Sequence, residues 1–450
     1  MKEQKTYYEL NPSQEVVMLQ CKYTLFKRVV NIISSIETKN NLNFDLMEKA
    51  YNLVVERNDC LRIRFKKQNK KLVQWFEEKL PYKTIPVISF NTKEEQEKFI
   101  DKLKKHAIKY KKGVTIEPYF IKTYDNKNMI LLKVCHLILD IYGINIIYKD
   151  LIDVYEALLN QTELPECPTS FEEVVKKDLR RKNNKETDAN NREFFTKLLN
   201  SKEEPYYAGL NGENNKLWQK QLAKNKRAMK MFFIRNDTKG YCLKIKKDIM
   251  DRVMEYCKQI NQSPANVLFF ASSVCASKIN GNVKNMLPLE LYNCRGSAHE
   301  KKCAGTKVQS LACYTTIDHD KSFEENFANF CLEQSKLYRH IGFSDQAFEM
   351  LLHKTYKSSM LETYYPLTFS FIPYTKPVDY TLNMYSNEKG ALITYIAQLY
   401  DINSGEMDIA YDCQTKIVSE QNVIDYHKNY ISLLKQITQN PKIILKDIKF

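Results

Sequence analysis

A histidine and an aspartate four residues apart, His136 and Asp140, stand between a strand-like run and a helix-like run. Residues 128–134 are mostly apolar, which predicts a strand, and apolar residues then recur at helical spacing from Ile144 to Leu158. This order places His136 at the end of a strand, where a side chain can leave the core and meet a substrate. Asp140 cannot share a helix face with it, and we expect its carboxylate to fold back and brace the loop.

Further short motifs accompany this pair in a fixed order along the chain. They are residues 11–15 (NPSQE), 56–65 (ERNDCLRIRF), 291–295 (LYNCR), 311–316 (LACYTT), 369–371 (FSF) and 407–412 (MDIAYD). Together they resemble the motifs of condensation domains of nonribosomal peptide synthetases, whose signature is HHxxxDG. The looser HxxxD of chloramphenicol-acetyltransferase-like acyltransferases is similar too. The resemblance extends over roughly residues 7 to 442 and rests on the collinearity of several motifs, since HxxxD alone is a weak signal.

The chain departs from the HHxxxDG signature at two positions. Cys135 replaces the first histidine, and Ile141 replaces the glycine, with Gly143 arriving two positions later. A glycine after the aspartate would let the backbone turn freely or leave room for a substrate, and Ile141 restricts both. A narrowed pocket, an unusual substrate and a weakened enzyme all stay open.

The resemblance implies an α/β (α+β) fold of two chloramphenicol-acetyltransferase-like lobes, arranged as a V-shaped pseudo-dimer with a central active-site tunnel. We expect residues 1–178 to form the N-terminal lobe with HxxxD, and residues 179–450 to form the C-terminal lobe. The boundary is placed near residues 180–186, the most polar stretch of the chain. Apolar residues make up 43% of the 450 residues, which is enough for a large core.

The resemblance also implies roles for individual residues. His136 acts as general base or positions the attacking amine, and Asp140 pairs with Arg295 of the "NR" strand. Cys135 could be a nucleophile, but adjacent strand residues point to opposite faces, so packing in the core is favoured. Structural support of the site is expected from Asp140, Arg295, Gly143 and Arg62, and the tunnel-lining candidates are Cys135, Ile141, Tyr142 and Ser370.

The substrates implied by the resemblance are an acyl or aminoacyl thioester and an amine, which make the chain an acyltransferase that forms amide bonds. No permanently bound cofactor is expected, because the acyl group is carried on the phosphopantetheine of a carrier protein or on coenzyme A. The acceptor is a small-molecule amine or a carrier-bound aminoacyl group. We find no adenylation domain and no carrier attachment motif, so we expect an acyl or peptidyl carrier protein acting in trans.

The net charge of +15 raises the question of a nucleic-acid partner. The excess is mostly scattered lysine, and no nucleic-acid-binding motif accompanies it. A solvated lysine-rich surface explains the charge without any partner. Attraction to an acidic carrier protein is the functional interpretation, because such steering speeds transient encounters. We therefore expect no nucleic-acid partner.

Other classes find little support in the sequence. No P-loop, GxGxxG, GxSxG or HExxH motif is present, and the cysteines show neither a zinc ligand set nor a disulfide framework. A signal peptide and an apolar run long enough for a membrane span are missing, so we expect a cytoplasmic protein. Two alternatives stay open: an N- or O-acyltransferase that uses acyl-coenzyme A, and a catalytically silent carrier-docking module.

Overall fold

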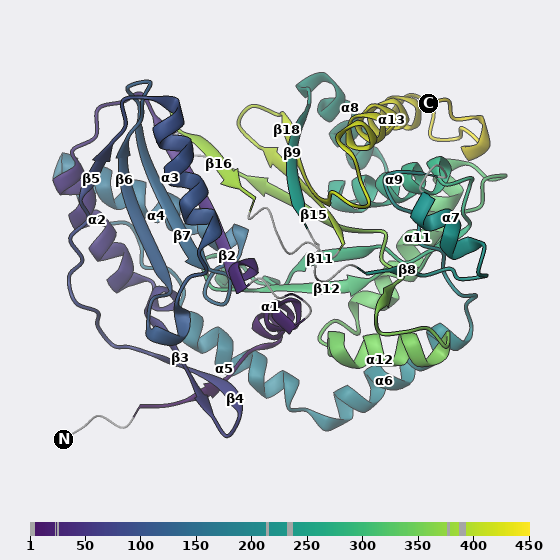
Figure 1. The fold of residues 1–450 in the computed structure, drawn as a ribbon, viewed down its shortest axis with the longest axis horizontal. Helices are drawn as coiled ribbons and strands as arrows, with labels where there is room; N and C mark the ends of the chain where they lie inside the picture. Colours follow the sequence, from purple (N-terminus) through teal and green to yellow (C-terminus); the bar gives the residue numbers. More distant parts are fainter. Residues whose placement is uncertain are drawn as a thin grey trace. The chain divides into compact units, whose positions relative to one another are not determined.

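The computed structural model describes residues 5–22, 24, 27–212, 216–231, 237–375, 379–386 and 393–450. The chain forms two compact units (Figure 1). Unit 1 contains Met1–Asn184, Asn293–Val308 and Thr375–Glu388. Unit 2 contains Lys185–Tyr292, Gln309–Tyr374 and Lys389–Phe450.

These units differ from two contiguous lobes, because two segments from the second half of the chain return to unit 1. The first break falls at Asn184, within the polar stretch chosen from the sequence. The division of the chain into lobes at residues 1–178 and 179–450 stays a prediction. The V-shaped arrangement and the tunnel also stay predictions.

Unit 1 is built on a five-stranded sheet with the order β16-β2-β7-β6-β5. Neighbouring strands are antiparallel, except that β5 and β6 are parallel. The strands are β16 (Thr381–Tyr385), β2 (Asn31–Thr38), β7 (Asn128–Cys135), β6 (Ile116–Lys122) and β5 (Val87–Ser89). The predicted strand before His136 is therefore the middle strand of this sheet.

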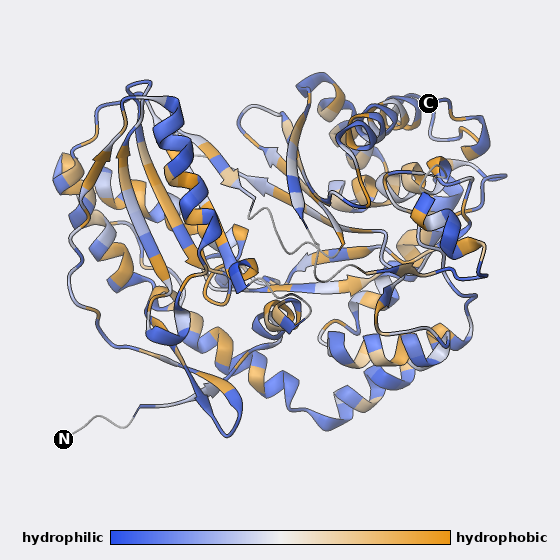
Figure 2. Cartoon of the chain, viewed as in Figure 1, coloured by the Kyte–Doolittle hydropathy of each residue, from blue (hydrophilic) through white to orange (hydrophobic). Residues whose placement is uncertain are grey.

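Helices cover both faces of β7. Side chains such as Met129 and Leu131 pack with Ile100 and Leu103 of α3 (Lys93–Lys105). The alternate side chains pack with α2 (Phe44–Arg57) and α4 (Ile141–Asn160) on the other face. A strand that is buried on both faces reads as a continuous apolar run, which explains the sequence of β7 (Figure 2).

Helix α3 ends at Lys105, although the charged amphipathic pattern of the sequence extends from Glu94 to Lys109. The side chain of Asn31 donates to the carbonyl of His106 (2.8 Å) and accepts from the backbone N–H of Ile108 (2.9 Å). These two hydrogen bonds hold the chain in a non-helical path that the local sequence does not predict.

Unit 1 also contains β1 (Tyr8–Glu9), β3 (Ile63–Gln68), β4 (Lys71–Phe76), α1 (Pro12–Lys22), α5 (Phe171–Lys182), α10 (Ala298–Lys301), η1 (Lys27–Val30), η2 (Asp59–Arg62) and η3 (Tyr110–Lys112).

Unit 2 is built on a six-stranded sheet with the order β12-β11-β15-β17-β18-β9. Strand β15 runs parallel to both β11 and β17, and the pairs β17–β18 and β18–β9 are antiparallel. The strands are β12 (Val308–Ala312), β11 (Leu289–Asn293), β15 (Leu367–Tyr374), β17 (Thr394–Asp401), β18 (Met407–Gln414) and β9 (Thr238–Ile245).

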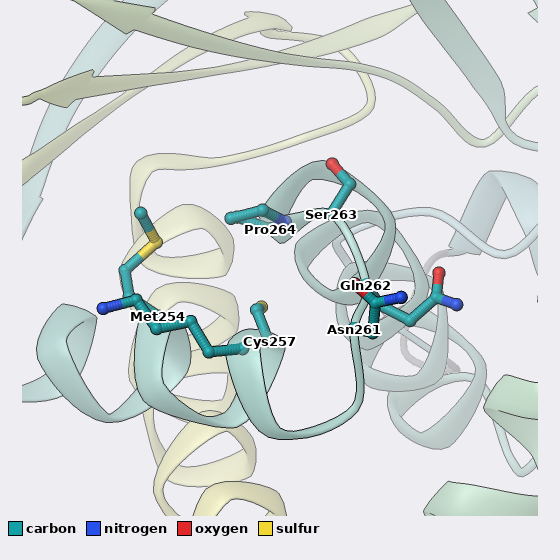
Figure 3. A pocket seen from close by; sticks show the side chains of 7 residues that line it. Met254, Cys257, Asn261, Gln262, Ser263 and Pro264 are labelled. Carbon is teal, nitrogen blue, oxygen red and sulfur yellow. The ribbon is translucent and has the colours of Figure 1, made fainter.

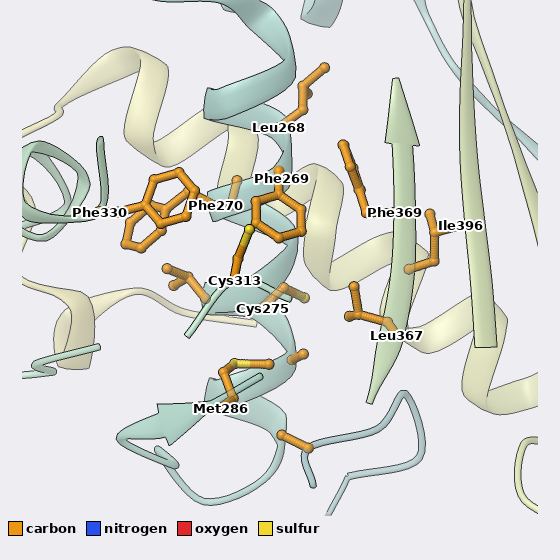
Figure 4. Close-up of a cluster of buried hydrophobic side chains, with 14 of the residues drawn as sticks. Leu268, Phe269, Phe270, Cys275, Met286, Cys313, Phe330, Leu367, Phe369 and Ile396 are labelled. Carbon is orange, nitrogen blue, oxygen red and sulfur yellow. The ribbon is translucent and has the colours of Figure 1, made fainter. Parts of the chain in front are cut away.

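The core of unit 2 surrounds α9 (Pro264–Ile279), which packs against β15. Ser263 caps the helix by accepting from the N–H of Ala265 (3.1 Å), and Pro264 occupies the first turn, where proline is tolerated. Phe269 and Phe270 of α9 lie among buried side chains of the sheet and of α11 (Figure 4). The helices of unit 2 are α6 (Lys185–Asn200), α7 (Lys216–Leu222), α8 (Lys247–Gln259), α9, α11 (Phe323–Tyr338), α12 (Asp345–Thr355), α13 (Glu420–Gln439) and η4 (Leu445–Asp447), with short strands β8 (Met229–Lys230), β10 (Asn285–Met286), β13 (Thr315–Thr316) and β14 (Glu362–Thr363).

Candidate active site

His136 is the first residue after β7, at the position predicted from the sequence. Its backbone N–H donates to the carbonyl of Val30 (2.7 Å), which extends the pairing of β7 with the chain that enters β2. The imidazole is half-buried. Its Nδ1 is buried and makes no hydrogen bond of normal geometry with the described residues. This leaves Nε2 as the ring nitrogen that can meet a substrate.

The environment of His136 favours the neutral ring. Burial lowers the pKa of His136 below its ordinary value, and the carbonyl of His136 itself, the carboxylate of Asp140 and the carbonyl of Leu139 act in the opposite direction. An ordinary histidine has a pKa of about 6.5. The imidazole is therefore mostly unprotonated near pH 7, as a proton acceptor must be.

Asp140 braces the loop in the manner expected from its position. It is the N-cap of α4, and its Oδ1 accepts from the backbone N–H of Gly143 (2.7 Å). Its Oδ2 accepts from the backbone N–H of Lys307 (2.8 Å). Arg295 donates to both oxygens, through Nη1 to Oδ2 (2.9 Å) and through Nη2 to Oδ1 (3.1 Å). The carboxylate is thus fully engaged, and His136 does not depend on it for a hydrogen bond.

Arg295 is a buried guanidinium whose N–H groups all find acceptors. Besides the two bonds to Asp140, Nε donates to Cys303 O (3.0 Å), Nη1 to Asn293 Oδ1 (3.0 Å) and Nη2 to Gly305 O. Burial alone would lower the pKa of Arg295, but the carboxylate of Asp140 raises it above its usual value. The ring of Tyr142 covers the guanidinium, with 4.7 Å between Cζ and the ring centroid.

Gly143 has a steric role in the first turn of α4. A Cβ atom at this position would lie 1.7 Å from the carbonyl oxygen of Ala304. The glycine therefore lets α4 approach the segment that carries Arg295. This contact explains why the chain needs a glycine at 143, although Ile141 occupies the position where the family signature has one.

The structure adds residues that the sequence did not identify as part of the site. Thr306 Oγ1 donates to the carbonyl of His136 (2.7 Å), and Lys307 binds Asp140 through its backbone. Gln14 donates to the carbonyl of Leu137 (2.9 Å) and exchanges hydrogen bonds with Asn11 in a cap of α1. The NPSQE motif was a signal for Gln14, whereas no sequence motif marks Thr306 or Lys307.

Two of the predicted site residues lie elsewhere. Arg62 donates to the carbonyls of Glu77 (2.9 Å), Val55 (2.8 Å) and Glu56, so it holds the end of α2, and none of these hydrogen bonds goes to HxxxD. Cys135 is fully buried in the apolar core of unit 1, and burial raises its pKa to about 12. Its assignment to the tunnel lining is corrected to a core position.

The other tunnel-lining candidates remain untested in that role. Ile141 and Tyr142 are half-buried at the start of α4. Ser370 is on β15 of unit 2, where its hydroxyl lies 2.7 Å from that of Tyr395. Their assignment to a tunnel stays a prediction.

A cavity of about 360 Å³ lies in unit 2, and none of the predicted site residues lines it. It is lined by Met254, Cys257, Lys258, Asn261, Gln262, Ser263 and Pro264 (Figure 3). In the described parts of both units, no group of His, Cys, Asp and Glu side chains could hold a metal ion. No helix there is both long and apolar enough to pass through a membrane.

The Condensation domain family matches residues 4–450. The chain belongs to this family. The expected membership is thereby confirmed, and the solved condensation domains described below confirm the expected two-lobed α/β fold. Condensation domains are acyltransferases that form amide bonds.

Curated relatives of this condensation domain are peptide synthetases. A plipastatin synthase of Bacillus subtilis (strain 168) is 20% identical over 427 residues, which cover 93% of this chain and 16% of the relative. Gramicidin S synthase 2 of Aneurinibacillus migulanus is 21% identical over 458 residues, which cover 98% of this chain and 10% of the relative. The chain thus spans less than a fifth of the length of these relatives.

Solved condensation domains share the fold. One is a variant of the starter condensation domain of rhizomide synthetase RzmA, in complex with C8-CoA and Leu-SNAC (TM-score 0.79, 14% identity, 99% of this chain and 97% of that chain). Another is the first condensation domain of the calcium-dependent antibiotic synthetase (0.78, 14%, 99% and 99%). A third is the condensation domain of the Monacolin K polyketide synthase MokA (0.80, 12%, 98% and 99%).

Proposed function

We propose that this condensation domain joins an acyl or aminoacyl thioester to an amine and so forms an amide in nonribosomal peptide, lipopeptide or fatty-amide biosynthesis. The observation that carries the proposal is the state of His136. Burial lowers its pKa and so favours the neutral imidazole, Nε2 is left for the substrate, and the loop is held by an aspartate that is paired with Arg295.

In the proposed reaction, the amine nitrogen attacks the thioester carbonyl, and His136 Nε2 accepts or directs the proton that the nitrogen loses. The C–N bond forms, the C–S bond breaks, and the proton passes on to the leaving thiolate. Much of the rate is expected from holding the two substrates together, since orientation can contribute roughly 7–11 kcal/mol. No covalent acyl-enzyme is required, which agrees with the buried and protonated thiol of Cys135.

We further propose that the acyl donor arrives on an acidic carrier protein that binds a basic rim beside His136. The rim consists of the exposed residues Lys27, Lys105, His106, Lys109, Lys111 and Lys112.

Hydrogen bonds place the rim beside the His136 loop. Val30, at the end of the short helix that carries Lys27, accepts from the N–H of His136. The next residue, Asn31, clamps the chain between His106 and Ile108. The sequence has no Asp or Glu between residues 16 and 36 or between 102 and 116, so acidic side chains from these segments do not neutralise the rim.

The charge makes the proposed docking sensitive to salt. Exposed charges are screened beyond about 8 Å at physiological ionic strength, so electrostatic steering should weaken as salt is added. The thioester chemistry at His136 should change much less. Carrier recognition and chemistry can therefore be measured separately.

The test compares one acyl group, octanoyl, on an acidic acyl carrier protein, on coenzyme A and on pantetheine, with Leu-SNAC as acceptor. These probes follow the ligands bound by the RzmA domain. The specificity constant kcat/KM is measured at two salt concentrations. We expect the carrier-bound donor to be preferred at low salt and the preference to fall at high salt.

Charge reversal locates the docking surface. We expect the triple variant Lys109→Glu, Lys111→Glu, Lys112→Glu to lower kcat/KM for the carrier-bound donor by roughly 10-fold at low salt. The same variant should leave kcat/KM for the pantetheine donor unchanged. The matched control reverses three exposed lysines of unit 2, Lys428, Lys435 and Lys442, with the same change in net charge.

Each other outcome favours a different function. Equal constants for all donors at low salt would remove carrier recognition and support an acyltransferase that uses acyl-coenzyme A. Binding of the carrier without turnover of any donor would support the silent docking module.

A further inference from the structure

We propose that Thr306 is a positioning residue for His136. This inference rests on the proposed function of His136 as the group that handles the proton of the amine. Thr306 is fully buried, and its Oγ1 donates to the carbonyl oxygen of His136 (2.7 Å). The hydroxyl therefore acts on the backbone of the same residue whose ring faces the substrate.

Thr306 belongs to a segment that contacts the HxxxD loop at both of its ends. We call residues 303–307 the clasp. Ala304 O contacts Gly143, and Gly305 O accepts from Arg295. Thr306 binds the carbonyl of His136, and the N–H of Lys307 binds Asp140. Consecutive residues of the clasp thus contact both ends of the HxxxD loop.

The clasp is itself anchored, so it can serve as a fixed reference for the loop. The carbonyl of Thr306 accepts from Asn11 Nδ2 (3.4 Å). The ammonium group of Lys307 donates to both oxygens of the buried Asp178 (2.9 and 3.2 Å). The backbone of Lys307 accepts from the N–H of Cys294 (2.8 Å). A movement of Thr306 would disturb several of these buried bonds at once.

The hydroxyl of Thr306 is the donor that the clasp offers to the carbonyl of His136, and its loss would weaken the hydrogen bonding of that carbonyl. A buried carbonyl without a donor costs about 1–3 kcal/mol, so the peptide unit after His136 would rotate to find one. Rotation of that peptide unit changes the backbone torsion at His136 and swings the imidazole. A displacement of about 1 Å at a reacting group can reduce the rate about 100-fold.

Two variants separate the shape of the Thr306 side chain from its hydrogen-bond donor. Thr306→Val replaces the hydroxyl by a methyl group, and Thr306→Ser keeps the hydroxyl. The control is Thr123→Val, since Thr123 is also buried and its hydroxyl also binds a nearby turn, with Asp125 Oδ1 (2.7 Å) and the carbonyl of Lys127 (3.1 Å) as acceptors. Thr123 precedes β7, whereas His136 follows it, so the control lies at the opposite end of the same strand.

Two readouts are measured on the full chain: the pKa of His136 from the NMR signals of its ring, assigned with His136→Gln, and kcat and KM for amide formation. We expect Thr306→Val to shift the pKa of His136 and to lower kcat at least 10-fold with little change in KM. Thr306→Ser should restore both readouts to near the wild-type values. Thr123→Val should leave both unchanged.

The pKa measurement separates this inference from the proposed function. If the wild-type protein shows no turnover with any donor, the function is wrong, and a shifted pKa of His136 in Thr306→Val still supports positioning. If Thr306→Val loses thermal stability but keeps the wild-type pKa and kcat, Thr306 is only a structural residue. Equal losses in Thr306→Ser and Thr306→Val would also overturn the proposal.

Discussion

The carboxylate of Asp140 and the guanidinium of Arg295 form a buried bidentate ion pair between residues 155 positions apart in the sequence. Hydrogen bonds from Gly143 and Lys307 satisfy the rest of the carboxylate, and backbone carbonyls receive other N–H groups of the arginine. A buried pair of this kind is costly to break, because either partner alone would be left as an uncompensated charge.

We therefore predict that Asp140→Asn and Arg295→Ala each reduce the free energy of unfolding by about 3–5 kcal/mol. The double variant should be far less destabilised than the sum of the two, because both changes remove one shared interaction. The free energies are measured by unfolding in urea. All variants carry Trp218→Phe, so that the remaining tryptophan, Trp75, reports on unit 1. Additive losses would contradict the pairing.

An exposed pair on the same helix provides the control for this cycle. Lys149 and Asp153 form an ion pair on the surface of α4, with side chains 68% and 36% exposed. Exposed pairs contribute at most about 1 kcal/mol. Lys149→Ala and Asp153→Asn should each change the free energy of unfolding by less than that amount.

The contact of Gly143 with Ala304 predicts a steric effect of a single methyl group. Gly143→Ala places a carbon within 1.7 Å of a backbone oxygen, so the first turn of α4 must move away from the clasp. We expect a loss of more than about 3 kcal/mol of unfolding free energy and lower kcat, because overpacking typically costs about 1–3 kcal/mol even where side chains can yield. The control is Gly296→Ala, whose new carbon meets only Glu300 Oε2 at 3.8 Å. Equal stability of the two variants would contradict the steric role.

His136 and its neighbour Cys135 should behave in opposite ways. His136→Ala should lower kcat at least 100-fold with little loss of stability, because a half-buried proton acceptor is removed. Cys135→Ala should keep most activity and lose about 1 kcal/mol of stability, because it removes only a buried sulfur atom from the core. Single-turnover amide formation and thermal unfolding check both. If Cys135→Ala loses activity and His136→Ala keeps it, the proton acceptor is misassigned.

The lowered pKa of His136 predicts a pH dependence with a definite sign. The unfolded chain binds a proton at a pKa of about 6.5, whereas the folded site binds it only at lower pH. Stability from His136 is therefore fully present above pH 6.5 and is lost as the pH falls from there through the folded pKa. The wild-type protein should lose unfolding free energy relative to His136→Gln in this window, and the other histidines cancel in the comparison. If the difference in unfolding free energy between the wild-type protein and His136→Gln stays constant from pH 7 to 5, the prediction is wrong.

Local sequence patterns predicted the elements that carry the site. The apolar run of β7 and the spacing along α4 placed His136 and Asp140 at the junction of a strand and a helix. The helices Phe44–Arg57 and Glu420–Gln439 likewise form over segments whose apolar residues recur at helical spacing. These predictions succeed because periodicity and capping act over a few neighbouring residues.

The resemblance of the motifs predicted the partnership of Asp140 with Arg295, which spacing alone could not do. Tertiary structure decided the rest. The early end of α3 depends on Asn31, the need for Gly143 depends on the carbonyl of Ala304, and the donor to His136 is Thr306, 170 residues away. Each contact forms only when distant segments close on one another. The sequence by itself therefore determined the strand, the helix and the chemical groups of the site, and only the folded chain determined which distant groups hold His136 in place.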